Sequence, residues 1–371
     1  MIVYWSLFAI TLLLASFVRD KQSQKISLCV RGIKNYNFTA KQIFLILIPM
    51  IFFFGLRSKV GDTAGYYYSF ENLTTNFSLV DLDDRAYGFS ILQRICKSFL
   101  FKHPNMWLTL LTLISVIPIT YILSKYSTDV RLSLFVFIAS TEFTYLINGA
   151  RQFVAVCICF YAFKFLVERK PVKYYLLVLL AISFHLTAIV MLFAYFLVRS
   201  KPWSIKMWLV IIVAVLICVF SETVFGFMND AFLEDSVYSH YAEDVMNTKG
   251  VNILRVMVAF VPVVLAFYCR KRIESQNCEY INCCINLSVL NAMCFLFAST
   301  MGANLTGRIA EFFTIYNLIL YPYLFTHALP KKEGSVIKII FYLAFTFFFV
   351  YQMQIAWGGL EYVSDVLGIS C

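Results

Sequence analysis

Long apolar runs recur along the whole chain and are separated by short polar segments. A run of roughly 20 apolar residues, folded as an α-helix, is long enough to cross the hydrocarbon core of a bilayer. Charged residues make up only 14% of the 371 residues and hydrophobic residues 61%, whereas soluble domains are about 25% charged. The sequence therefore predicts an all-α, polytopic transmembrane bundle of about ten helices, with residues 1–371 forming a single integral membrane domain.

The net charge of +10 raises the question of nucleic-acid binding. The basic residues, however, lie in short segments between apolar runs, as the positive-inside rule expects of cytoplasmic loops. We therefore attribute them to topology and to anionic headgroups, and expect membrane lipids and no nucleic acid as partners. The 11 cysteines have no metal-ligand spacing with histidine, so we expect no metal site.

The positive-inside rule also gives a topology. Positive charges follow the first apolar run instead of preceding it, which favours a retained first helix with its N-terminus outside. Two segments, 57–104 and 221–250, are predicted to be extracytoplasmic loops with interfacial or re-entrant helices, the first of them irregular. Residues 132–147 and 309–328 are each predicted to form one continuous membrane helix.

One apolar stretch, residues 174–198, does not fit this topology because basic residues flank it on both sides. A simple crossing would place one of the two basic clusters outside. We therefore predict a broken element, in which two short helical arms meet near Phe184 and His185 and both ends lie on the cytoplasmic side. The alternative is one uninterrupted helix that violates the charge rule. Non-helical backbone within the membrane must be buried in protein or line a water-filled cavity. We therefore expect His185, at the break, to lie at such a cavity.

Three arginines are predicted at outer helix ends, against the usual charge bias: Arg57, Arg151 and Arg308. A guanidinium offers a planar fork of donors that matches phosphate oxygens, so these residues suggest an anion site together with His185. Arg151 follows Asn148-Gly149, a turn-type dipeptide, so its side chain is expected beside free N–H groups at a helix start. The alternative is that each arginine pairs with a carboxylate or extends to lipid headgroups.

Other polar residues extend this candidate site. Glu311 lies three residues after Arg308 on the same helix face, where it either forms an internal ion pair or orients that arginine towards a phosphate. Asp62 lies in a glycine-flanked loop, where it can cap a turn. Tyr66 and its neighbours offer stacking faces to sugars or form an interfacial belt. Glu142 is expected to pair with a cation or to act as a base.

Several common catalytic motifs are absent from the sequence. It has no Walker loop, no zinc spacing, no Gly-x-Ser-x-Gly elbow and no Asp-x-Asp of the kind that holds a metal against a nucleotide sugar. Any chemistry is therefore expected to proceed without a nucleotide, a metal or another cofactor.

The order of the short polar motifs resembles that of the EpsG family of Wzy-like polysaccharide polymerases. The strongest part is Asn148-Gly-Ala-Arg151-Gln152, followed by Phe184-His185 some thirty residues later. The segment from Arg57 through Gly61-Asp62-Thr63 to Tyr66 and the late Gly307-Arg308 segment fit the same pattern, and the similarity in hydropathy covers nearly the whole chain.

This resemblance implies a multi-pass enzyme of the bacterial inner membrane with a GT-C-like glycosyltransferase fold. It would join oligosaccharide repeat units carried on undecaprenyl diphosphate into O-antigen, capsule or exopolysaccharide at the outer face. Carried over to this sequence, Arg57, Arg151 and Arg308 would hold the diphosphate, Asp62 would shape the loop at the mouth of the site, and His185 would line the acceptor site. Further partners would be a chain-length regulator and a flippase of the same pathway.

The candidate residues suit an inverting, metal-independent glycosyl transfer. Arginines stabilise the charge that develops on a departing diphosphate, and a histidine accepts the proton of the attacking hydroxyl. Three alternatives use similar residues: a flippase or transporter of the lipid-linked oligosaccharide, a ligase that transfers whole glycans from the lipid carrier, and a non-catalytic scaffold. A flippase would usually show internal repeats, which we do not find.

Overall fold

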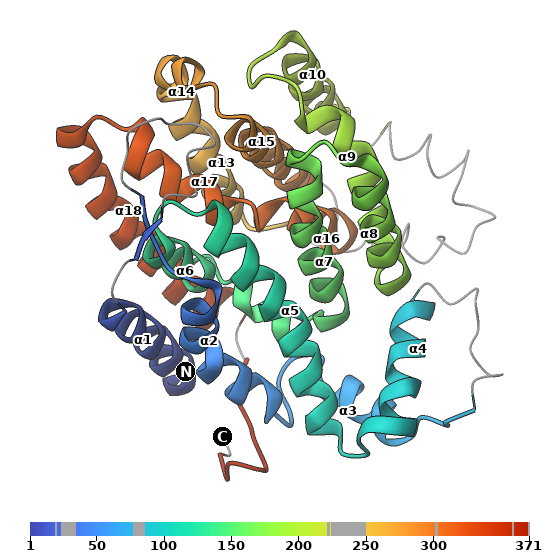
Figure 1. Ribbon diagram of the computed structural model, residues 1–371. Coiled ribbons are helices and arrows are strands. Elements are labelled where there is room, and N and C mark those ends of the chain that lie inside the picture. The colour runs from blue at the N-terminus through green and yellow to red at the C-terminus, as the bar shows by residue number, and fades with distance from the viewer. Residues whose placement is uncertain are drawn as a thin grey trace.

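Helices form almost all of the structure, a computed structural model that describes residues 1–18, 21–23, 35–76, 86–220, 223, 250–300, 303–357 and 360–369. Within these ranges one two-stranded antiparallel ribbon precedes the second helix. Figure 1 shows the helices packed side by side in one bundle around α5, α7 and α15. The loop predicted at 221–250 lies almost wholly outside the described residues.

The first half of the chain supplies the short helices α3 and α4 beside the site and two of the three central helices, α5 and α7. Its elements are α1 (Ile2–Phe17), β1 (Lys21–Ser23), β2 (Asn35–Asn37), α2 (Ala40–Gly55), α3 (Thr63–Glu71), α4 (Tyr87–Ile95), the π-helix η2 (Cys96–Leu100), α5 (Pro104–Tyr126), α6 (Val130–Ala139), the 3-10 helix η3 (Glu142–Leu146) and α7 (Ala150–Val167).

The second half begins with a broken helical hairpin and ends with a long peripheral helix. Its elements are α8 (Pro171–Phe184), the 3-10 helix η4 (Leu186–Ile189), α9 (Val190–Val198), α10 (Ile205–Val219), α13 (Ile253–Tyr268), α14 (Arg270–Gln276), α15 (Glu279–Thr300), α16 (Ala303–Thr314), α17 (Asn317–Tyr323), the π-helix η6 (Leu324–Ala328), α18 (Lys331–Tyr351) and the π-helix η7 (Gln352–Ala356).

The chain is a membrane protein. Among the described residues, four helices are long and apolar enough to cross a bilayer: Pro104–Tyr126, Ala150–Val167, Glu279–Thr300 and Lys332–Ala356. A fifth span is present if α13 and α14, which meet at a bend of 68°, act as one. Several shorter apolar helices accompany them, so the count of about ten membrane helices and the GT-C-like arrangement stay predictions.

The centre and the periphery of the bundle differ in burial. In the most apolar stretch of α15, 72% of the residues are buried, against 28% in α18. Aromatic side chains hold the centre together: Tyr316 packs against Phe160 and Phe163, with ring centroids 5.3 and 5.2 Å apart, and its hydroxyl donates to the Cys159 carbonyl. Rings paired in this way add about 0.5–1.5 kcal/mol each beyond the area they bury.

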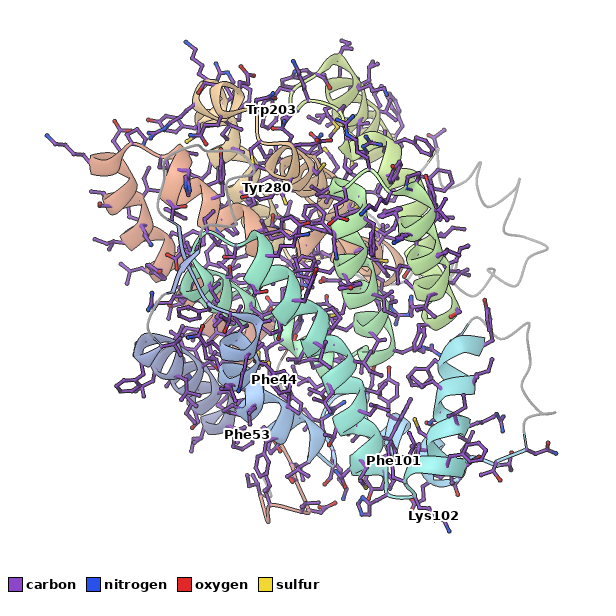
Figure 2. The ribbon with its side chains drawn as sticks, in the orientation of Figure 1. Phe44, Phe53, Phe101, Lys102, Trp203 and Tyr280 are labelled. Carbon is purple, nitrogen blue, oxygen red and sulfur yellow. The ribbon has the colours of Figure 1, made fainter. Side chains whose placement is uncertain are left out.

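Labelled residues mark the two ends of the bundle. Phe101 and Lys102, at the turn before α5, mark one end together with α3 and α4, and Trp203 marks the opposite end near α10 (Figures 1 and 2). The basic segment Arg270-Lys271-Arg272 of α14 lies at the Trp203 end. By the positive-inside rule, the α3 and α4 end is predicted to be the outer end.

Two predicted continuous helices are interrupted. The predicted helix 132–147 ends at Ala139, and Thr141 adopts a left-handed φ of 67° before the 3-10 turn that begins at Glu142. This turn brings the buried carboxylate of Glu142 beside Glu311. The predicted helix 309–328 is divided into α16, α17 and η6. Periodicity alone did not reveal these breaks because the residues around them are as apolar as a helix core.

The segment 174–198 is broken, as predicted. Helix α8 ends at Phe184, His185 is extended (φ −154°, ψ 120°), and η4 and α9 follow. The Tyr174 hydroxyl, near the start of α8, donates to the Met191 carbonyl at 2.7 Å, and its ring lies 5.0 Å from that of Tyr195, near the end of α9. The chain therefore returns alongside itself as a hairpin with His185 at its tip, and the alternative of one uninterrupted helix is wrong.

The location of both hairpin ends on the cytoplasmic side stays a prediction that labelling can test. Lys173 and Lys201 are both exposed. With each replaced in turn (Lys173→Cys, Lys201→Cys) in a background without other accessible thiols, we expect a membrane-impermeant maleimide to label both from the same side of the membrane. Labelling from opposite sides would contradict the hairpin topology. Lys102→Cys, at the other end of the bundle, serves as the control for outside labelling.

Candidate functional site

A cavity of about 550 Å³ lies where the starts of α7, α13 and α16 meet the tip of the α8–α9 hairpin. We call it the central cavity. Its polar lining includes Arg151, His185, Arg255 and Arg308, and α3 contributes Tyr66 to its rim. Asp62, just before α3, completes that rim. The structure thus brings together five of the predicted site residues, Asp62, Tyr66, Arg151, His185 and Arg308, from segments up to 246 positions apart.

The start of α7 is held by the α3 segment. Gly149 precedes the helix with a left-handed φ of 88°, which glycine adopts without steric cost. Its N–H donates to Asp62 Oδ2 at 3.0 Å, and the N–H of Arg151 donates to the Tyr66 hydroxyl at 3.1 Å. The Asn148 amide, with its nitrogen turned towards Asp62, donates to both carboxylate oxygens at 3.0 and 3.2 Å.

These contacts correct one expectation about Arg151. The N–H groups at the helix start were predicted to be free for an anion, but Asp62 and Tyr66 already accept from two of them. The guanidinium of Arg151 is half-buried and lies 5.9 Å from the centre of the Phe89 ring. Burial raises the pKa of Tyr66, so its hydroxyl stays protonated at neutral pH and continues to accept this hydrogen bond.

His185 lies at the hairpin tip, outside every candidate span, and faces the central cavity. Its Nδ1 is 2.6 Å from the Thr187 hydroxyl, which fixes the ring and leaves Nε2 for a ligand. Burial, helped by the positive charges of Arg151 and Arg308, lowers the pKa of His185 to about 4. The imidazole is therefore neutral at physiological pH, and it is a weaker base than an ordinary histidine.

Arg308 is exposed to the cavity, but Glu311 does not orient it. Glu311 is only 1% exposed, and it bonds Arg255 at 2.8 Å and the Tyr145 hydroxyl. The prediction of an Arg308–Glu311 unit is therefore wrong, because a buried carboxylate pairs with the cation that shares its desolvated environment. Arg308 is held instead through its backbone, whose carbonyl accepts from Gln152 Nε2 at 2.7 Å.

Arg255 is a site residue that sequence reasoning missed. It lies in the first turn of α13, and its guanidinium lies 5.2 Å from the Phe295 ring and 5.5 Å from that of Trp357. The signal that could have found it is a single cation at the outer start of an apolar run, the same signal that singled out Arg151. Glu142 lies beside Glu311 beneath the cavity floor, and its predicted pairing with a cation stays a prediction.

Arg57 does not reach the central cavity. It is fully buried, its Nε donates to the Thr63 hydroxyl at 2.8 Å, and its Nη1 donates to the Phe54 carbonyl at the end of α2. Burial lowers its pKa to about 10, which leaves it charged at neutral pH. The structure therefore does not bring Arg57 into the predicted anion site, and its role in holding a diphosphate stays a prediction. Only a short connection separates α2 from α3, and this places the guanidinium against the helix C-terminus, where a cation is favourable.

The comparison with protein families covers most of the chain. The sequence model of the EpsG family matches residues 41–360, a range that includes every cavity residue named above. The chain belongs to the EpsG family. Membership links this EpsG-family protein to polysaccharide biosynthesis. No curated protein and no solved structure matches the chain.

The different surroundings of Arg57 and Arg308 give a testable difference in stability. Arg57→Ala removes two buried hydrogen bonds from a charged donor and leaves their acceptors unpaired, a loss of about 2 kcal/mol or more. We expect a clear fall in the apparent Tm of the detergent-purified protein. Arg308→Ala, at an exposed position, should change the free energy of unfolding by less than about 0.5 kcal/mol. Equal Tm values for the two variants would contradict this assignment.

Proposed function

We propose that this EpsG-family protein is a glycosyltransferase that joins oligosaccharide repeat units carried on undecaprenyl diphosphate into O-antigen, capsule or exopolysaccharide. It would act at the outer face of the bacterial inner membrane, as a bundle of about ten membrane helices with a GT-C-like arrangement. The observation that carries the proposal is one cavity at the predicted outer end, where Arg151 and Arg308 flank a neutral imidazole. Cations suited to a diphosphate and a group able to accept a proton thus share one site.

In the proposed reaction, a sugar hydroxyl of the acceptor attacks the anomeric carbon of the donor. The new glycosidic C–O bond forms as the C–O bond to the diphosphate breaks, and undecaprenyl diphosphate leaves with the electron pair. Arg151 and Arg308 stabilise the negative charge on that leaving group. The hydroxyl proton passes to Nε2 of His185. Attack opposite to the leaving group gives inversion, and the arginines supply the positive charge without a metal.

Arg255 contributes in a different way from the other two arginines. Its charge is matched by Glu311, so it is less available to a diphosphate than that of Arg151 or Arg308. Through this ion pair and its contact with the Tyr145 hydroxyl at 2.9 Å, it ties α13 to α16 and to η3 at the cavity floor. We assign it to holding the cavity in shape, with Asp62 and Tyr66 holding its rim.

The decisive experiment uses purified protein and the lipid-linked repeat unit of its host. The wild type should produce a ladder of products of increasing chain length. Arg151→Ala and Arg308→Ala should each lower kcat about 100-fold or more, as loss of a charge-stabilising donor does, while Arg169→Ala should act like the wild type. Arg169 is an exposed arginine in a surface pair with Glu279, so it controls for loss of positive charge alone.

Other outcomes of this assay would identify a different function. Transport of intact single units across proteoliposomes without joining them would indicate a flippase. Transfer of one whole glycan to a different acceptor, without a ladder, would indicate a ligase. Either result would refute the polymerase.

The lowered pKa of His185 predicts the pH dependence of chain extension. Since the imidazole loses its proton near pH 4, it is already in the proton-accepting form throughout the neutral range. We expect kcat/KM to be level from about pH 8 to pH 6 and to fall only as the pH approaches the lowered pKa, because kcat/KM reports the free enzyme. A diphosphate esterified at both ends adds no ionisation near neutrality. An acid limb near the ordinary histidine value of about 6.5 would contradict the prediction.

A further inference from the structure

A second cavity, of about 560 Å³, lies between α3 and α4 and shares Asp62, Tyr66 and Arg151 with the central cavity. We call it the α3–α4 groove. Its own lining is Gly65 and Ser69 of α3 with Phe89, Ser90 and Gln93 of α4. The two cavities therefore lie on either side of one rim, and the guanidinium of Arg151 faces both.

The lining of the groove differs from that of the central cavity in charge. Apart from Arg151 and Asp62 at the shared rim, it consists of aromatic rings, hydroxyls, one amide and one glycine. Sites that bind neutral polar ligands combine aromatic faces with a few directed polar groups. A diphosphate would meet a single cation here, whereas the central cavity offers it Arg151 and Arg308. The groove therefore suits a neutral saccharide better than a lipid-linked diphosphate.

The two walls of the groove are fixed to each other. Gln93 Nε2 donates to the Ser69 hydroxyl at 3.2 Å, and Lys97 Nζ donates to the carbonyls of Phe70 and Glu71 at 2.8 and 2.6 Å. The ring of Tyr66 also lies 5.9 Å from that of Phe89. A groove with walls held in this way is preformed, which lowers the entropic cost of binding.

The groove is also coupled to the tip of the hairpin. Gly88 of α4 lies directly against Ser183, so closely that a Cβ at position 88 would overlap the Ser183 hydroxyl. Ser183 is two residues before His185. The same helix that forms one wall of the groove therefore packs next to the residue assigned as proton acceptor.

We infer that the α3–α4 groove binds the acceptor saccharide, whose attacking hydroxyl passes over the Asp62–Tyr66–Arg151 rim towards His185. This inference rests on the proposed function, because only a glycosyltransferase has an acceptor saccharide. Binding of a saccharide in the groove can nevertheless be measured without turnover. The donor diphosphate occupies the central cavity on the far side of the rim, so Arg151 stands between the two substrates.

The chain offers a matched pair of blocking variants. Gly65 and Gly307 are helical glycines, and an added Cβ at either position meets no atom within 4 Å. Gly65 lines the groove and Gly307 lines the central cavity. Gly65→Trp and Gly307→Trp therefore place bulk in one cavity each without a clash at the backbone, and each variant serves as the control for the other.

The test uses the host's repeat-unit oligosaccharide, released from its lipid by mild acid, because such a saccharide can accept but cannot donate. With lipid-linked donor present, Gly65→Trp should raise the KM for this acceptor at least tenfold and leave donor affinity unchanged. Gly307→Trp should weaken donor binding and leave the acceptor KM unchanged. Arg169→Ala, which lies outside both cavities, should match the wild type. The inference is overturned if Gly65→Trp leaves the acceptor KM unchanged. It is also overturned if Gly65→Trp weakens donor binding as much as acceptor binding.

Direct binding separates failure of this inference from failure of the proposed function. Saturation-transfer NMR with the lipid-free saccharide should detect binding to the wild type and to Gly307→Trp but not to Gly65→Trp. That binding pattern supports the groove as a saccharide site even if the chain-extension assay gives no ladder. The absence of a ladder would refute only the polymerase. Binding retained in Gly65→Trp, or no binding to the wild type, overturns the groove assignment.

Discussion

Two hydrogen bonds between α3 and the start of α7 hold the site together. They run from the N–H groups of Gly149 and Arg151 to the side chains of Asp62 and Tyr66. The first turn of a helix has N–H groups without intrahelical partners, and these must be satisfied when they are buried. Here the partners come from a segment more than eighty residues earlier, so the same contacts that complete α7 also fix α3 beside it. These hydrogen bonds also hold together Asp62, Tyr66 and Arg151, the rim that both cavities share.

A buried group of charges supports the cavity from below. Arg255 and Glu311 are paired, the Tyr145 hydroxyl bonds both, and Glu142 lies beside them. Removing one partner from such a buried pair leaves an uncompensated charge and costs about 3–5 kcal/mol. This group comes from η3, α13 and α16, so it links three elements that the sequence separates widely. Arg151 and Arg308 have no carboxylate partner among the described residues, and we propose that they bind substrate for that reason.

The sequence predicted the membrane bundle and the break at His185 because both follow from local composition. Apolar runs specify membrane helices, and basic residues on both sides of 174–198 could not be reconciled with a simple crossing. It also identified two arginines of the central cavity, Arg151 and Arg308, from their unusual position at predicted outer helix ends. It could not predict the partners of Arg57 or Glu311. The partner of Glu311 is 56 positions away on another helix, and spacing along one helix reveals only neighbours three or four residues apart.

The α3–α4 groove and the central cavity are built from different helices. Apart from the rim, the groove is lined by small polar and aromatic side chains of α3 and α4, whereas the arginines and the imidazole come from α7, the hairpin and α16. Ser69, Ser90 and Gln93 can therefore be exchanged without altering any group that carries charge. Such a division lets one scaffold adapt to a new glycan sequence through a few substitutions on two short outer helices, and it indicates where engineering of sugar preference should begin.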